Sequence, residues 1–183
     1  MKSENLVKYV LRLTVTLLLI TGIVAAALAG VNAITKDAIA ANQAKKTQDA
    51  LAVVLPNTQG LQQLPLSGEN GIVQEVYAAG GSYAVKVAPS GFDGAVTMMV
   101  GISEGKVTGI SVISHTETPG LGAVAAADSA KGEAFRNQFV GLVGGIVVDG
   151  ENNSIDSMSG ATITSKAVVA GVNAALEFVG NLG

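Results

Sequence analysis

The chain has 183 residues and a net charge of −3, with one histidine, no cysteine and no tryptophan. The lack of cysteine excludes disulfides, iron–sulfur clusters, c-type haem attachment, thiolate zinc sites and cysteine nucleophiles. A single histidine excludes a multi-histidine metal site, so no metal is predicted and redox chemistry would need an organic cofactor. The sequence pI near 5.1 and the 11 Lys and Arg residues argue against a nucleic-acid partner. Charged residues make up only 14%, which indicates a membrane segment or an unusually apolar surface.

The amino-terminal segment contains an uncharged, mostly apolar run of 23 residues, 13–35. About 20 apolar residues suffice for a helix to cross the bilayer core. Basic residues lie on both sides of the run: Lys2, Lys8, Arg12, Lys36, Lys45 and Lys46. The positive charges on the two sides of the run are nearly equal. Placing the first flank in the cytoplasm, we expect residues 1–35 to form a cytoplasmic tail and a single-pass inner-membrane anchor. The carboxy-terminal domain would then lie on the periplasmic or extracellular side.

Two alternatives to the anchor remain open at this point. A cleaved signal peptide would place Ala27 and Ala29 at the small-x-small cleavage positions, and it would also export the remaining chain. A buried helix of a soluble protein is the second alternative.

The remaining chain contains signals for one helix and linker, 36–70, and then a domain, 71–183. A helix over 37–55 should end before Pro56, because proline disfavours the helical conformation in the residue before it. The domain's expected strands cover residues 72–77, 83–88, 94–103, 106–114 and 146–148, and its expected helices cover residues 122–139 and 164–179. Strands that precede the helices predict an α+β fold, with an antiparallel sheet and flanking helices.

The segment that begins the last expected helix carries the strongest chemical signal. Four hydroxyl residues lie within residues 156–166: Ser159, Thr162, Thr164 and Ser165. One explanation is helix capping, in which a Ser or Thr side chain accepts a backbone hydrogen bond worth about 1 kcal/mol. The other is an anion site, because a helix start offers free N–H groups and the positive end of the helix dipole to a phosphate. Gly160 and Ala161 would admit a bulky group, and Lys166 would add positive charge.

Two segments of this sequence resemble the motifs of one known family. Residues 156–162 resemble the flavinylation motif Asp-x-x-Ser/Thr-Gly-Ala-Thr of covalent FMN-binding domains. Residues 115–122, His-Thr-Glu-Thr-Pro-Gly-Leu-Gly, resemble the Glu-Thr-Pro-Gly-Leu-Gly loop of the same family. Together with the amino-terminal helix, the resemblance covers essentially the whole chain, and neither motif departs from the pattern. It is closest to the G subunits of Rnf ion-translocating ferredoxin:NAD oxidoreductases. The C subunits of sodium-pumping NADH:quinone reductases share both motifs but are usually longer.

The resemblance implies roles for individual residues. Thr162 would carry FMN through a phosphoester installed by an FAD-dependent flavin transferase, and Asp156 would belong to what the transferase recognises. The implied cofactor-binding residues are Thr162, Ser159, Gly160, Ala161, Thr164, Ser165, Lys166, His115, Glu117, Thr118, Gly120, Leu121 and Gly122. A structural hydrogen-bonding role remains the alternative for His115, and a tight turn into the next helix remains the alternative for the loop residues. No catalytic residue is expected, because the flavin supplies the redox centre while the protein binds and orients it.

The implied function is that of an electron carrier in a membrane-bound, redox-driven ion pump made of several subunits. Expected partners are other membrane, iron–sulfur or flavin subunits, the flavin transferase during maturation, and membrane lipid. The alternatives are an FMN-bearing extracellular electron-transfer protein, the C subunit of a sodium-pumping NADH:quinone reductase, and a membrane-anchored binding module without a cofactor. The chain alone is not expected to turn over a specific substrate, because it contains no acid, base and nucleophile constellation.

Overall fold

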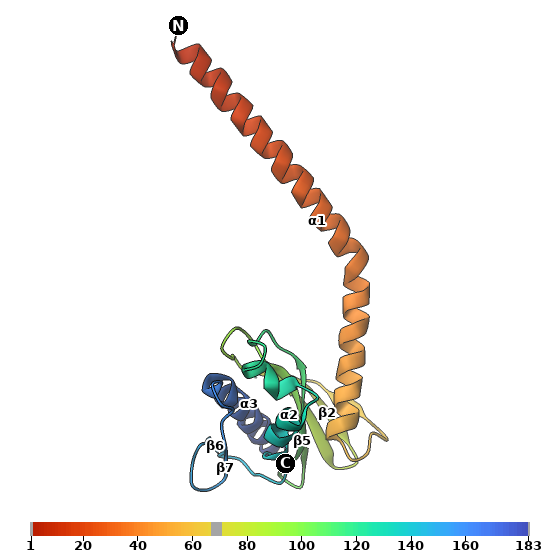
Figure 1. The fold of residues 1–183 in the computed structure, drawn as a ribbon. Coiled ribbons are helices and arrows are strands. Elements are labelled where there is room, and N and C mark those ends of the chain that lie inside the picture. Colours follow the sequence, from red (N-terminus) through yellow and green to blue (C-terminus); the bar gives the residue numbers. More distant parts are fainter. Residues whose placement is uncertain (1, 67–70, 183) are drawn as a thin grey trace. The chain divides into compact units, whose positions relative to one another are not determined.

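The computed structural model describes residues 2–66 and 71–182 and divides the chain into two compact units, 1–44 and 45–183. The first unit is helical and belongs to α1 (Lys2–Val54), drawn in red and orange in Figure 1. Within the described residues, two helices are long and apolar enough to cross a membrane, α1 and α3 (Thr162–Gly180). Half of the apolar window in α3 is buried, as in the core helix of a domain, whereas side chains are exposed throughout residues 6–34 of α1. The described part of the chain therefore leaves the apolar side chains of the predicted run 13–35 uncovered.

The second unit is built around an antiparallel sheet, as predicted. Among the residues that the structure describes, five strands pair in the order β1-β2-β3-β4-β5, each antiparallel to the next (Figure 1). Their bounds are β1 (Gln62–Leu64), β2 (Val73–Ala79), β3 (Ser82–Val87), β4 (Thr97–Ser103) and β5 (Lys106–Ser114). Tight turns join β2 to β3 and β4 to β5, so each strand lies beside its neighbour in the sequence. Sequence analysis did not predict β1. This strand falls in the segment expected to be a linker, and it pairs with β2 at the edge of the sheet.

The sheet buries both of its faces. On one face the main core packs valines and methionines of the strands, such as Val85 and Met98, against Val168 and Val172 of α3. On the other face a smaller cluster packs Ala84 and Met99 against the last turns of α1. Apolar residues on both faces, as in β4, are the pattern of a sheet that is covered on both sides.

The carboxy-terminal end of α1 is fixed to the sheet by its backbone. The Thr108 hydroxyl of β5 donates a hydrogen bond of 2.6 Å to the Val54 carbonyl, one of the carbonyls that a helix end leaves unpaired. A Cβ at Gly101 of β4 would collide with that same carbonyl oxygen. The helix ends at Val54, before Pro56, as the proline predicts.

The helix predicted over residues 122–139 is wrong as a single element. The chain forms a short 3₁₀ helix, η1 (Gly122–Ala126), and then a separate helix, α2 (Ala130–Asn137). Ser129 interrupts the run because its backbone is extended and its side chain accepts a hydrogen bond from the Gly132 amide, which makes it an N-cap. The predicted strand 146–148 is shortened to β6 (Val147–Val148), which pairs in parallel with an unpredicted strand, β7 (Ser154–Ile155).

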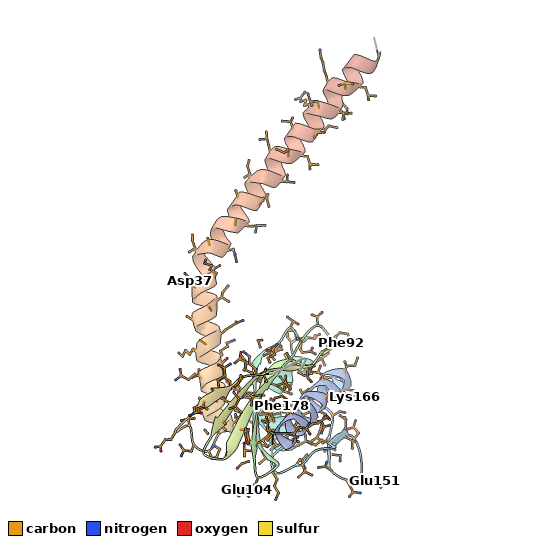
Figure 2. The ribbon with its side chains drawn as sticks, turned by 180° about the vertical axis from the view of Figure 1, so that it is seen from behind. Asp37, Phe92, Glu104, Glu151, Lys166 and Phe178 are labelled. Atoms are coloured by element: carbon orange, nitrogen blue, oxygen red, sulfur yellow. The ribbon has the colours of Figure 1, made fainter. Side chains whose placement is uncertain are left out.

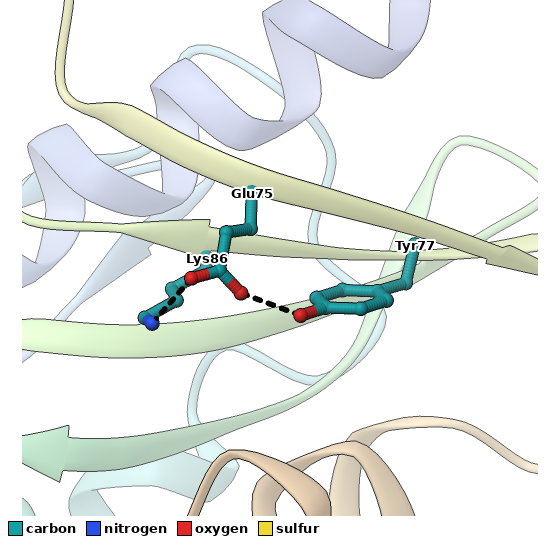
Figure 3. Close-up of polar contacts among 3 residues, drawn as sticks. All are labelled: Glu75, Tyr77 and Lys86. Atoms are coloured by element: carbon teal, nitrogen blue, oxygen red, sulfur yellow. Dashed lines mark hydrogen bonds and ion pairs between the residues drawn. The ribbon is translucent and has the colours of Figure 1, made fainter. Parts of the chain in front are cut away.

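A polar network lies across β2 and β3. The Glu75 carboxylate accepts hydrogen bonds of 2.7 Å from the Lys86 ammonium and 2.5 Å from the Tyr77 hydroxyl (Figure 3). Burial alone would raise the pKa of Glu75, but the contacts with Lys86 and Tyr77 outweigh burial and lower it. Burial, followed by the hydrogen bond to Glu75 and its charge, raises the pKa of Tyr77 to about 12.

Candidate flavin site

The fold brings the two sequence motifs together at one cavity of about 340 Å³. One wall comes from the loop between β5 and η1, and the other comes from the start of α3. The lining residues are Phe92, Glu117, Thr118, Leu121, Gly122, Gly160, Ala161, Thr162, Ile163 and Thr164. The volume is within the range of small-molecule sites, and the lining is mainly apolar with a few polar groups, as is typical of such sites.

Thr162 is the first residue of α3 and is exposed beside this cavity. The helix-capping explanation for the hydroxyl residues is wrong, because Ala161 occupies the N-cap position and its methyl side chain cannot accept a cap hydrogen bond. An uncapped start leaves its first N–H groups free for an anion. Gly160 precedes it with a φ of +73°, a conformation that favours glycine, and a Cβ there would lie 3.1 Å from the Leu121 side chain. The site therefore offers an exposed hydroxyl, an anion-binding helix start and an apolar cavity, which fit the phosphate and the ring system of FMN.

The two neighbouring hydroxyl residues point elsewhere. Thr164 is 2% exposed, and its hydroxyl donates a hydrogen bond to a Glu117 carboxyl oxygen. Ser165 is fully buried, and its hydroxyl donates to the Ala161 carbonyl and accepts from the Met158 amide, each at 3.0 Å. Both hydroxyls are engaged inside the protein, so Thr162 carries the exposed hydroxyl of the first turn of α3.

Glu117 is buried, with 4% of its surface exposed, and it connects three segments. Its Oε1 accepts hydrogen bonds from the amides of Phe92 at 2.9 Å and Asp93 at 3.3 Å, while Oε2 accepts from Thr164. A Cβ at Gly122 would collide with Oε2, which explains the glycine at this position of the loop. A buried carboxyl group is tolerated only when hydrogen bonds compensate for its lost hydration, so these three donors are part of the stability of the site.

Sequence analysis missed two residues of the cavity, Phe92 and Ile163. Both are large apolar side chains that remain mostly exposed, at 67% and 54%. The available signal for Phe92 was an aromatic residue inside the glycine turn Gly91-Phe92-Asp93-Gly94, in a chain with only 4% aromatic residues.

The segment that leads to Thr162 is held by side chains from elsewhere in the domain. Gln138 accepts from the Asp156 amide at 2.7 Å, and Asp149 accepts from the Ser157 amide at 2.8 Å. This bond from the Ser157 backbone is the main reason that the pKa of Asp149 is lowered. The Asp156 side chain itself is left exposed on a fixed backbone.

The structure does not bring every predicted residue to the Thr162 cavity. Gly120, Asp156 and Ser159 line an adjacent cavity of about 300 Å³ that shares Leu121 with the first. Lys166 is exposed on α3, one turn beyond Thr162, and does not line the Thr162 cavity. His115 lies in a third cavity, between β5 and the last turns of α1, where its buried Nδ1 has no hydrogen-bond partner among the described residues.

Known protein families match both the amino-terminal and the carboxy-terminal part of the chain. The family model of the FMN-binding domain matches residues 91–177, and the model of the RnfG N-terminal region matches residues 1–54. The G subunit of the Na(+)-translocating ferredoxin:NAD(+) oxidoreductase complex of Acetobacterium woodii is 34% identical over 96% of this chain and 94% of its own. The chain belongs to the family of Rnf G subunits. The family predicted from the two motifs is thereby confirmed.

Two further relatives support the assignment to the Rnf G subunits. The G subunit of the ion-translocating oxidoreductase complex of Methanosarcina acetivorans is 30% identical over 94% of this chain and 95% of its own. The G subunit of the proton-translocating ferredoxin:NAD(+) oxidoreductase complex of Clostridium ljungdahlii is 40% identical over 54% of this chain and 53% of its own.

A solved structure confirms the fold class. The C subunit of the Na(+)-translocating NADH-quinone reductase from Parabacteroides distasonis superposes with a TM-score of 0.54 at 19% identity, covering 75% of this chain and 90% of that one. At this identity the likeness concerns the fold alone: an α+β domain with an antiparallel sheet.

Proposed function

We propose that this Rnf G subunit carries FMN covalently on Thr162 and passes electrons through it within a membrane complex. The observation that carries the proposal is the exposed Thr162 hydroxyl at an uncapped helix start, in a cavity built by both family motifs. In the loading step, the Thr162 oxygen attacks the FMN phosphorus of FAD and the pyrophosphate bond breaks. AMP leaves, the hydroxyl proton goes to solvent or to a base of the transferase, and no electrons change hands.

The residues around Thr162 suit this group. The free N–H groups at the start of α3 and the positive end of its dipole stabilise a phosphodiester anion. Leu121 and Ile163 are 43% and 54% exposed at the cavity and offer apolar surface to a flat ring system. The flavin supplies redox chemistry that joins two-electron and one-electron carriers, while the chain fixes its position and shields its ring.

The wider role follows from the family. We propose that the chain works with the other membrane, iron–sulfur and flavin subunits of an Rnf complex that translocates ions, as the names of its relatives state for them. Residues 13–35 would anchor it in the membrane lipid, and the flavin domain would lie outside the cytoplasm. A tether is useful there, because a dissociated flavin would diffuse away from the complex.

Flavin loading can be tested on the chain produced together with an FAD-dependent flavin transferase. After denaturing electrophoresis, the wild-type band should fluoresce under ultraviolet light, and Thr162→Ala should not. Thr162→Ser is the matched control, since it keeps a hydroxyl in the same place. A fluorescent Thr162→Ala band would contradict the proposed attachment site, and a dark wild-type band would contradict covalent flavin altogether.

Topology can be tested by labelling, because the natural chain has no cysteine. Glu104 lies in the exposed turn between β4 and β5, at the end of the domain opposite the labelled Phe92 (Figure 2). With Glu104→Cys, a membrane-impermeant maleimide should label intact cells without permeabilisation. Labelling only after the membrane is opened would contradict the external location.

A further inference from the structure

Phe92 is an aromatic side chain that the described part of the chain leaves mostly uncovered. The chain has four phenylalanines. Phe135 and Phe139 are buried and stack edge to face, with 5.6 Å between their ring centroids, and Phe178 packs against the core. Phe92 alone is exposed, at 67%, and it lines the cavity beside Thr162. Figure 2 shows it at the end of the domain where α3 begins, near the labelled Lys166.

The turn that carries Phe92 is fixed at its tip. The Gly91 amide donates to the Gly94 carbonyl at 2.7 Å, and the Thr116 hydroxyl donates to the Asp93 carbonyl at 2.7 Å. A Cβ at Gly91 would collide with the carboxyl group of Glu117, so the glycine allows the carboxyl group to approach the turn. The exposed ring therefore stands on a backbone that has lost its freedom, as expected of a side chain placed in advance for a ligand.

Glu117 relates this turn to the attachment point. One carboxyl oxygen holds the amides of Phe92 and Asp93, and the other holds the hydroxyl of Thr164, two residues after Thr162. The same buried group thus sets the distance between the aromatic ring and the start of α3. Removing its acceptors would leave the Phe92 and Asp93 amides without these bonds and loosen the turn at Phe92, while Phe92 stays in the sequence.

We propose that Phe92 packs against the ring system of the flavin carried by Thr162, and that Glu117 is the positioning residue that holds Phe92 there. This inference rests on the proposed function. Aromatic rings gain from offset or edge-to-face contact beyond the area they bury, and the isoalloxazine ring is a flat partner of that kind. Leu121 and Ile163 complete an apolar rim around the cavity. The occupant of this rim is the chain's own flavin, and a partner protein seated on Phe92 is the competing outcome.

The test measures how well the protein shields the ring in the loaded, full-length chain in detergent. The readouts are iodide quenching of flavin fluorescence and fluorescence anisotropy, with FMN loading measured separately by intact mass. Phe92→Ala should raise the iodide quenching constant towards the value of the denatured chain and lower the anisotropy. Phe92→Tyr should keep both near the wild-type values. Val140→Ala, at a residue that is 50% exposed and outside the cavity, should change neither.

Separate variants test the role of Glu117. Glu117→Met keeps the length of the side chain but accepts no hydrogen bonds, so it should expose the ring as Phe92→Ala does. Glu117→Gln should restore shielding, because its amide oxygen can accept from the turn and its amide nitrogen can donate to Thr164. Thr164→Val breaks only the bond to α3 and keeps both bonds to the turn, so it should expose the ring less than Glu117→Met does.

Three results would overturn the inference. Loaded Phe92→Ala with unchanged quenching and anisotropy would show that Phe92 faces a partner and not the flavin. A wild-type flavin that iodide quenches as strongly in the folded as in the denatured chain would show that nothing shields it. Thr164→Val that exposes the ring as much as Glu117→Met would reduce the role of Glu117 to general stability. An unloaded wild-type chain would instead contradict the proposed function, and intact mass separates that failure from the others.

Discussion

Replacing Thr164 by valine should destabilise the domain without preventing flavin attachment. The change swaps a hydroxyl for a methyl group of similar size, so it leaves no cavity. It removes the donor to the buried Oε2 of Glu117, and the structure shows that both residues are almost fully buried, at 2% and 4% exposed. A buried acceptor that loses its donor costs about 1–3 kcal/mol, which corresponds to a fall of roughly 4–12 °C in Tm for a domain of this size.

The assay is thermal unfolding of the full-length chain followed by near-ultraviolet circular dichroism, which reports Tyr77 and Tyr83 of the sheet. Thr164→Ser is the matched control, because it keeps the hydroxyl and should stay within about 1 kcal/mol of the wild type. Flavin loading of Thr164→Val should be retained. A Tm equal to that of the wild type would refute the importance of the Glu117 cluster, and a folded Thr164→Val without flavin would refute the choice of attachment residue.

Two further predictions concern the loop glycine and the sheet. Gly122→Ala should lower Tm by several degrees in the same assay, because its Cβ would collide with the buried carboxyl group of Glu117; an unchanged Tm would contradict the packing described here. In an absorbance titration, one tyrosine should ionise at about 12, and Tyr77→Phe should abolish that component, because burial, together with Glu75, raises the pKa of Tyr77 from 10.0. Since the folded pKa exceeds the unfolded one, this stabilisation is fully present below about pH 10 and is lost as the pH rises towards about 12. The fall in Tm between about pH 9 and about pH 11 should therefore be smaller in Tyr77→Phe, and equal falls would show that Tyr77 is not coupled to folding.

Much of the fold could be predicted from local chemistry. The apolar run 13–35 and the stop before Pro56 depend only on hydrophobicity and on the geometry of proline, and the structure has one helix that ends at Val54. The β-branched runs and the short turn between residues 103 and 106 similarly predict strands, a hairpin and an antiparallel sheet. The single helix predicted over 122–139 is wrong. That prediction used the helical spacing of the phenylalanines and overlooked the capping residue Ser129, which interrupts the helix. The edge strand β1 could not be predicted, since three residues carry no period and form a strand only by pairing with β2.

Sequence analysis identified several cavity residues that lie within the two motifs. It misplaced His115 and did not identify Phe92. His115 stands two residues before Glu117, yet it lies in a different cavity, against the last turns of α1. Residues two apart share one side of a regular strand, but β5 ends at Ser114, so strand alternation does not extend to His115 and Glu117 and closeness in sequence does not place both in one site. Phe92 was missed because it is far from both motifs in the sequence, and the bonds of its turn to Glu117 and Thr116 place it at the cavity only in the folded chain.

The central claim is that Thr162 carries FMN, and peptide mass spectrometry of the chain purified from its native membrane tests it most directly. The account predicts a peptide containing Thr162 that is heavier by the mass of FMN minus water, with fragment ions that place the added mass on this threonine. Quantitative modification is expected in a mature complex, because Thr162 is the exposed hydroxyl of its turn while those of Thr164 and Ser165 are buried and bonded. An unmodified peptide, or added mass on Thr164 or Ser165, would contradict the account.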